Sequence, residues 1–167
     1  MFGLDPSLTI LLLICLLCAC AFEFINGFHD TANAVATVIY TNSLKPTTAV
    51  IWSGVFNFLG VLFGGTAVAM TIIKLLPNGI LVDQSITSNV IMILSMLVSA
   101  IIWNLGTWYL AIPCSSSHTL IGSVLGVGIA YTLMQGGDLG TGVNWSKASS
   151  TGLSLLLTPL VGFLFTL

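Results

Sequence analysis

A cluster of polar and ionisable residues directly follows a long apolar run near the start of the chain. The run from Leu8 to Phe22 contains one distinctly polar residue, Thr9, and the cluster is Asn26-Gly-Phe-His-Asp-Thr-Ala-Asn33. Carboxylates and amides at membrane depth are costly unless they line a cavity, pair with another group or bind an ion. This cluster is therefore the first candidate for a functional site.

In a helix, four oxygen-bearing side chains from this region would share one face, because i, i+3 and i+4 positions are neighbours. They are Asn26, Asp30, Asn33 and Thr37. One carboxylate with neutral amide and hydroxyl oxygens suits Na⁺ or another hard cation, or a proton held on Asp30. Gly27 leaves room for a backbone break that would free carbonyl oxygens as further ligands. A polar contact between helices is the alternative, but the acid and the histidine favour a functional role.

A second polar cluster, Pro113-Cys-Ser-Ser-Ser-His-Thr119, precedes the apolar, glycine-rich stretch Leu120–Ala130. Proline, serine and threonine suit the first turn of a helix, whose unpaired N–H groups and positive dipole end attract anions. Its hydroxyl groups add donors without adding charge, which predicts a site for phosphate or sulfate. The predicted ligands are Ser115, Ser116, Ser117 and Thr119.

Two other interpretations of the second cluster are less favoured. An ordinary serine cap needs only one hydroxyl group. A serine nucleophile with a histidine base is disfavoured because adjacent residues seldom reach triad geometry, and the sequence contains no G-x-S-x-G motif. The chain is accordingly not expected to be an enzyme.

Three more ionisable residues in or near the clusters are candidates for carrying a proton or cation: His29, His118 and Glu23. Either histidine could instead hydrogen-bond a neighbouring carbonyl group, and Glu23 could lie at the membrane interface. Thiols on a lipid-embedded helix behave as small hydrophobic groups, so the three cysteines from Cys15 to Cys20 predict packing rather than metal ligation. We expect no structural metal site and no cofactor.

Composition indicates a membrane protein. Of the 167 residues, 56% are hydrophobic and 5% are charged, whereas soluble domains carry about a quarter charged residues. The only cations are Lys45, Lys74 and Lys147, too few for nucleic-acid binding. The expected fold class is therefore an all-α, multi-pass integral membrane protein, a helix bundle in the lipid bilayer with no nucleic-acid partner.

Several stretches reach the length of about 20 apolar residues that a membrane-crossing helix needs. We expect spans at Ser7–Ile25 and Thr47–Ile73, two passes between Gln84 and Gly137 divided at Pro113, and a last span at Ala148–Leu167. Two further segments, Asp30–Tyr40 and Ser115–Met134, begin with polar residues and predict broken or re-entrant helices. The lysines are too few to orient the chain.

The two clusters resemble signatures of the inorganic phosphate transporter (PiT) family. Asn26–Tyr40 is similar to the family pattern G-x-N/H-D-x-A-N-A, and Ile102–Trp108 with Pro113–Gly122 is similar to a second conserved region. The forms His-Asp and Ser-Ser-Ser-His are similar to those of bacterial low-affinity phosphate permeases. The resemblance covers nearly the whole chain.

This resemblance implies a secondary transporter of two inverted repeats, with substrate at the midplane beside broken helices. It places phosphate and the coupling ion at Asp30 and Asn33, and the tip of a hairpin at Ser115, Ser116, Ser117 and Thr119. It further implies coupling to H⁺, with phosphate carried as a neutral complex with a divalent metal, or coupling to Na⁺. The implied location is the bacterial inner membrane.

Length is where the sequence departs from the family pattern. Family members run to several hundred residues, and this sequence contains neither a second signature nor a central hydrophilic loop. We expect residues 1–167 to form a single transmembrane domain, the N-terminal repeat, whose site needs a C-terminal half or a second copy. The alternatives are a sulfate permease of the same build, and a non-transporting membrane scaffold or fragment.

Overall fold

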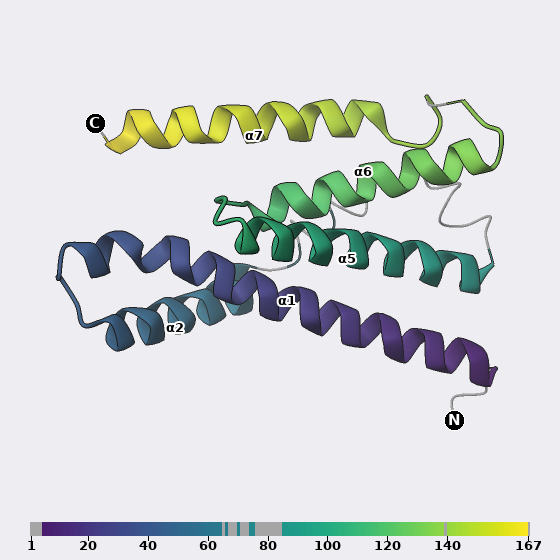
Figure 1. The fold of residues 1–167 in the computed structure, drawn as a ribbon. Coiled ribbons are helices and arrows are strands. Elements are labelled where there is room, and N and C mark those ends of the chain that lie inside the picture. Colours follow the sequence, from purple (N-terminus) through teal and green to yellow (C-terminus); the bar gives the residue numbers. More distant parts are fainter. Residues whose placement is uncertain are drawn as a thin grey trace.

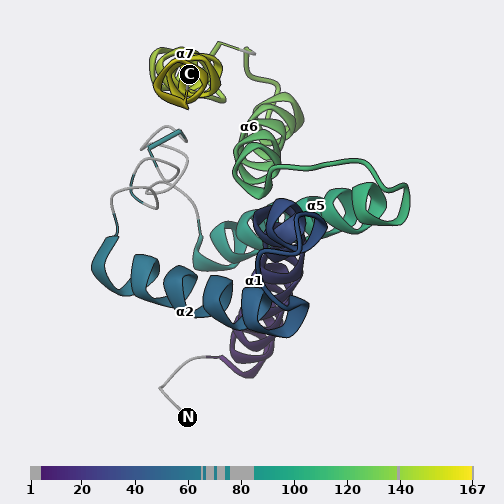
Figure 2. The same cartoon turned by 90° about the vertical axis from the view of Figure 1, so that its left-hand side faces the viewer.

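The computed structural model describes residues 5–64, 66, 70, 74–75, 85–138 and 140–166, and these ranges contain five α-helices. They are α1 (Pro6–Tyr40), α2 (Pro46–Gly64), α5 (Ile86–Tyr109), α6 (Ser116–Met134) and α7 (Trp145–Thr166). Their axes run broadly along one direction in Figure 1, whereas Figure 2 shows α7 end-on and α2 and α5 running across the view. All five are long and apolar enough to cross a membrane, which confirms the predicted all-α membrane bundle.

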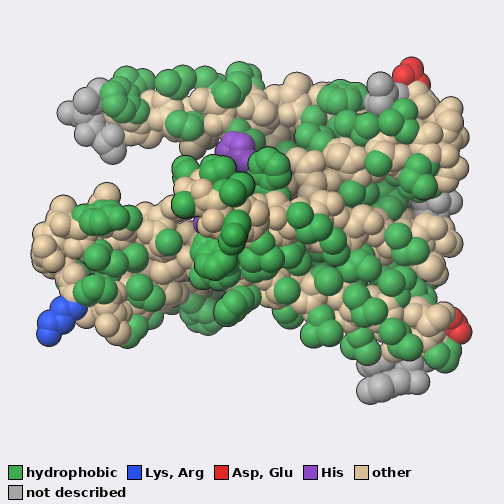
Figure 3. All heavy atoms as spheres, viewed as in Figure 1, with side chains coloured by type: hydrophobic (Ala, Val, Ile, Leu, Met, Phe, Trp, Pro, Cys, Tyr) green, Lys and Arg blue, Asp and Glu red, His purple; other side chains and the backbone are tan. Residues whose placement is uncertain are grey.

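Several charged residues lie at or just beyond the ends of these helices, whereas Glu23 and Asp30 lie within α1. Asp5 precedes α1, Lys45 precedes α2, and Asp138 lies between α6 and α7. Figure 3 shows charged groups at the two ends of the bundle, with hydrophobic and uncharged surface between them. Large side chains such as Phe63 and Leu156 are exposed on this surface. A bundle whose sides face lipid has this distribution, because hydrocarbon does not solvate charge.

Helix α1 passes through the first polar cluster without a break. The predicted span Ser7–Ile25 and the predicted short segment Asp30–Tyr40 are parts of one helix of 35 residues, so the predicted break at Gly27 is wrong. The Gly27 carbonyl oxygen instead accepts a hydrogen bond from Thr31 Oγ1 at 2.7 Å. One glycine lowers the stability of a helix by about 1 kcal/mol, but each unpaired backbone group in lipid costs several kcal/mol. The helix therefore continues through Gly27.

Helices α5 and α6 form an antiparallel hairpin. After α5, the Ile112 N–H donates to the Thr107 carbonyl at 2.9 Å, Ala111 adopts a φ of 55°, and Pro113 prevents the helix from continuing. The predicted division at Pro113 is thus confirmed. In Figure 1 the tip of the hairpin stops beside α1, short of the far ends of α1 and α7. Helix α6 is long and apolar enough to cross a membrane, so the re-entrant segment stays a prediction.

The two remaining predicted spans correspond to α2 and α7. Helix α2 begins at Pro46 and ends at Gly64, and most of the rest of the predicted span, up to Ile73, lies outside the described residues. Helix α7 begins three residues before the predicted Ala148. Neither helix carries any part of the two polar clusters.

Among the described glycines, Gly142 has the closest packing, because the α6–α7 connection lies against α6 there. A Cβ at Gly142 would overlap Thr132 Oγ1 and lie 2.6 Å from the Gly128 carbonyl oxygen. Replacing Gly142 with alanine should therefore destabilise the fold by about 1–3 kcal/mol. Thermal unfolding in detergent measures this loss. The control is Gly140→Ala, whose Cβ meets nothing within 4 Å, and equal melting temperatures for the two variants would contradict the packing argument.

Candidate functional site

The tip of the α5–α6 hairpin brings the two polar clusters into contact. Ser116, the first residue of α6, donates a hydrogen bond from its Oγ to Asp30 Oδ2 on α1 at 3.3 Å. The two residues are 86 positions apart in the sequence, and both are half-buried. The hydroxyl-rich cluster and the acidic cluster therefore form one polar region, where the hairpin tip meets α1.

Ser115 is the N-cap of α6. Its Oγ accepts the His118 N–H at 3.5 Å and lies 2.8 Å from His118 Nδ1. A cap of this kind satisfies one of the backbone donors that the first turn leaves unpaired. The serine-cap interpretation is thus correct for Ser115, and the cap also places an imidazole ring at the positive end of the helix dipole.

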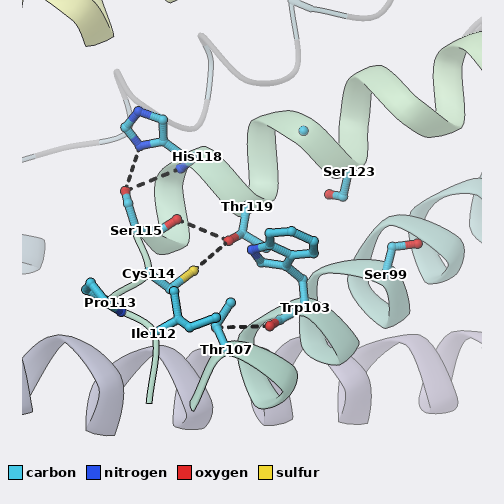
Figure 4. Close-up of a pocket in the computed structure, with 11 residues that line it drawn as sticks. Ser99, Trp103, Thr107, Ile112, Pro113, Cys114, Ser115, His118, Thr119 and Ser123 are labelled. Carbon is cyan, nitrogen blue, oxygen red and sulfur yellow. Dashed lines mark hydrogen bonds between the residues drawn. The ribbon is translucent and has the colours of Figure 1, made fainter. Parts of the chain in front are cut away.

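A buried polar contact lies beneath the cap. Thr119 Oγ1 donates to the Ser115 carbonyl oxygen at 3.1 Å and lies 3.2 Å from Cys114 Sγ. Cys114 Sγ in turn donates to Asn104 Oδ1 on α5 at 3.5 Å. Figure 4 shows the Thr119 hydroxyl between Ser115 and Cys114. The loop between α5 and α6 is therefore anchored to both helices by side-chain contacts.

A pocket of about 650 Å³ opens on this side of the hairpin. Figure 4 shows Ser115, His118 and Thr119 at the start of α6, with Trp103 and Ser99 on the α5 side. None of the described residues that line the pocket is acidic. Hydroxyl groups and a helix N-terminus without a carboxylate are suited to holding an oxyanion.

The structure divides the predicted phosphate ligands between two places. Ser115 and Thr119 line the pocket, whereas Ser116 contacts Asp30. Ser117 on α6 and Asn33 on α1 are exposed, and neither lines the pocket. The six predicted ligands therefore do not surround one point, although all except Asn33 lie at the hairpin tip or at its contact with α1.

The predicted cation side chains lie along α1, apart from His118, which lines the pocket. Asn26 and Asp30 are half-buried, whereas Asn33, Thr37 and Glu23 are exposed. His29 is buried at 9% exposure, and its ring stacks on Phe28 at 6.2 Å.

Asn26 differs from the rest of this set because its Oδ1 is buried and has no hydrogen-bond partner among the described residues. An unpaired buried acceptor is unfavourable. Asn26 lies one helical turn from Asp30. A cation or a protonated group bound near Asp30 would give Asn26 Oδ1 the partner that it lacks.

Sequence reasoning overlooked Asn104. This residue of α5 is 1% exposed and contacts Cys114 at the hairpin tip, yet the sequence patterns did not mark it as a site residue. The available signal was its type, because an amide in the middle of an apolar helix is as costly as the amides of the first cluster.

Comparisons with known proteins identify the family that this chain resembles. The model of the phosphate transporter family matches residues 26–167. The low-affinity inorganic phosphate transporter PitA of Escherichia coli K12 is 49% identical over 163 residues, which cover 98% of this chain and 33% of PitA. PitB of the same strain is 46% identical over 160 residues, 96% of this chain and 32% of PitB.

A more distant relative is the probable low-affinity inorganic phosphate transporter of Bacillus subtilis, 41% identical over 156 residues, 93% of this chain and 44% of that protein. The chain thus spans about a third of the length of the E. coli relatives and less than half of the B. subtilis one. No solved structure matches.

The relatives are named as transporters, in agreement with the expectation that the chain is not an enzyme. Five potential membrane-spanning helices and the bacterial relatives agree with the expected multi-pass protein of the bacterial inner membrane. The family match covers most of the chain and includes both polar clusters. The chain therefore belongs to the phosphate transporter family.

Proposed function

We propose that this chain binds inorganic phosphate and takes part in its transport across the membrane, coupled to H⁺ or Na⁺. The observation that carries the proposal is the contact of Ser116 with Asp30 at 3.3 Å, beside a mainly apolar pocket whose lining includes Ser115 and Thr119. This contact sets an anion-binding helix terminus next to a carboxylate that can take up a cation. Such a pair allows the binding of an anion and the binding of a cation to influence each other.

In this proposal, phosphate binds in the pocket at the start of α6. The Ser115 and Thr119 hydroxyl groups and the His118 ring line this pocket, and the first turn of α6 adds backbone N–H donors. Neutral donors bind an oxyanion reversibly, so the substrate can be released on the other side of the membrane. Ser117 is exposed in this structure and would take part only through a rearranged first turn.

Asp30 is the proposed carrier of the coupling ion. Its carboxylate accepts the Ser116 hydroxyl, so a proton or Na⁺ taken up at Asp30 would lie one residue away from the anion pocket. Attraction between the two bound charges would make each ligand strengthen the binding of the other. The unpaired Asn26 Oδ1 and the oxygens of Asn33 and Thr37 are further candidate ligands. A divalent metal travelling with phosphate would meet the same oxygens.

Alternating access in inverted-repeat transporters requires a second repeat across the substrate site. We propose that a second repeat, from a C-terminal half or from a second copy of this chain, completes the site. The greater length of the relatives supports this view.

The chain, reconstituted in liposomes so that a second copy or a C-terminal half can complete the site, is expected to take up radiolabelled phosphate when a H⁺ or Na⁺ gradient is imposed. Comparing the two gradients identifies the coupling ion, and adding divalent metal tests the metal-phosphate form. Excess sulfate should leave uptake unchanged, whereas strong competition would favour the sulfate permease. If the chain neither takes up nor binds phosphate in the presence of either ion, the proposed function is wrong and the scaffold alternative gains support.

A further inference from the structure

Asn104 occupies an unfavourable position for an amide. It lies in α5, is 1% exposed, and its Nδ2 has no hydrogen-bond partner among the described residues. Its backbone carbonyl oxygen is already occupied by the Thr107 hydroxyl at 3.0 Å. A buried polar atom without a partner lowers stability, so the fold gives no reason for the Nδ2 group of this amide.

The side-chain contacts of Asn104 lead directly to the phosphate pocket. Asn104 contacts Cys114 Sγ at 3.5 Å, and Cys114 Sγ lies 3.2 Å from Thr119 Oγ1. Thr119 then bonds to the Ser115 carbonyl oxygen at 3.1 Å. Cys114, Thr119 and Ser115 line the pocket, but Asn104 does not. The Asn104 amide therefore lies behind the wall of the pocket. It contacts Cys114, which in turn contacts the Thr119 hydroxyl.

The number of hydrogens in this chain of contacts has a definite consequence. The three contacts are Asn104–Cys114, Cys114–Thr119 and Thr119–Ser115. When Oδ1 of the amide faces Cys114, only the thiol and the Thr119 hydroxyl can donate, so one of the three contacts has no hydrogen. Rotating the amide by 180° lets Nδ2 donate to Sγ, the thiol donate to Thr119 and Thr119 donate to Ser115. Every contact then has its hydrogen, and either orientation leaves one amide atom buried and unpaired.

We propose that Asn104 is a positioning residue for anion binding, acting through Cys114 on the Thr119 hydroxyl and the cap at Ser115. This inference rests on the proposed function. In this proposal Asn104 serves phosphate binding and not the stability of the fold. Replacing it should therefore lower the phosphate affinity without lowering the stability. Leucine has nearly the shape of asparagine and needs no hydrogen bond, which makes Asn104→Leu the informative substitution.

Asn104→Leu is expected to weaken phosphate binding about five- to tenfold, the effect of losing one hydrogen-bonded contact. Its melting temperature in detergent should equal or exceed that of the unchanged chain. Binding of radiolabelled phosphate and tryptophan fluorescence on heating measure the two quantities. The matched control is Ser95→Ala, an exposed serine of the same helix whose hydroxyl donates to the Ile91 carbonyl oxygen of that helix. A parallel loss of stability and binding in Asn104→Leu would show a merely structural role.

A double-mutant cycle tests whether the effect passes through Cys114. In the Cys114→Ala background, Asn104→Leu is expected to cause no further loss of phosphate affinity, because the connection is already broken. Full additivity of the two losses would overturn the proposal.

A second readout does not depend on phosphate. With Cys15, Cys18 and Cys20 replaced by alanine, maleimide labelling reports on Cys114 alone, since these are the four cysteines of the chain. Asn104→Leu should raise the labelling rate by about threefold or more, because it frees a thiol otherwise held by the amide. An unchanged rate would refute the positioning role even if the chain does not bind phosphate. A changed rate without any phosphate binding would refute the proposed function instead.

Discussion

Replacing Asp30 with asparagine is expected to abolish ion-coupled phosphate uptake. Asparagine has the same shape and can still accept the Ser116 hydroxyl that Asp30 Oδ2 accepts at 3.3 Å. It cannot take up a proton or balance the charge of Na⁺. Two opposite unit charges about 4 Å apart attract by about 4 kcal/mol at an effective dielectric constant of 20. Losing that attraction weakens coupled binding by roughly a thousandfold.

The measurement for Asp30→Asn is uptake of radiolabelled phosphate by proteoliposomes under the gradient that drives the unchanged chain. Asp138→Asn is the matched control, because it removes the same charge from the exposed α6–α7 connection. Glu23→Gln tests the other acid of α1, which is exposed and should be dispensable. Unimpaired uptake by Asp30→Asn would rule out Asp30 as the coupling residue, and loss of uptake in Glu23→Gln alone would transfer that role to Glu23.

Replacing Ser115 with aspartate is expected to eliminate phosphate binding while preserving the helix. Aspartate is as good an N-cap as serine, and its charge favours the positive end of the α6 dipole. The new carboxylate would stand on the wall of the pocket that Ser115 lines. Repulsion between it and the bound anion, again about 4 kcal/mol at 4 Å, predicts a loss of affinity of about a hundred- to a thousandfold.

Ser115→Asn is the control for this substitution. Asparagine caps helices equally well and differs from aspartate only in charge, so its phosphate affinity should stay within about tenfold of the unchanged chain. Equilibrium binding of radiolabelled phosphate to both variants in detergent separates the effect of charge from that of shape. If Ser115→Asp binds phosphate as tightly as Ser115→Asn, phosphate does not occupy the pocket at the start of α6.

The sequence indicated the class of the protein because hydrocarbon imposes strict rules on composition. Five helices with few charges follow from the need to pair every backbone group inside the bilayer. Pro113 and the serines after it predicted the end of α5 and the start of α6, because proline cannot continue a helix and serine caps the next one. These signals are local, and a sequence displays them directly.

Gly27 shows where such local reasoning failed. A glycine beside an acid predicted a broken helix, but α1 continues through it to Tyr40. The weak helix propensity of glycine is a small term, and the cost of unpaired backbone groups in lipid is a larger one. The length of α1 in turn determines that Asp30 lies within a helix rather than at a helix end.

By itself, the sequence determined a membrane-embedded helix bundle with one acidic and one hydroxyl-rich cluster, because the cost of polar atoms in hydrocarbon makes such clusters conspicuous. Only the tertiary structure decided which members of the clusters meet. Packing of the hairpin tip against α1 pairs Ser116 with Asp30, directs Ser115 and Thr119 into the pocket, and leaves Ser117 and Asn33 exposed. It also buries Asn104 behind Cys114. These choices depend on how the helices are rotated and crossed, which side-chain packing between distant segments sets.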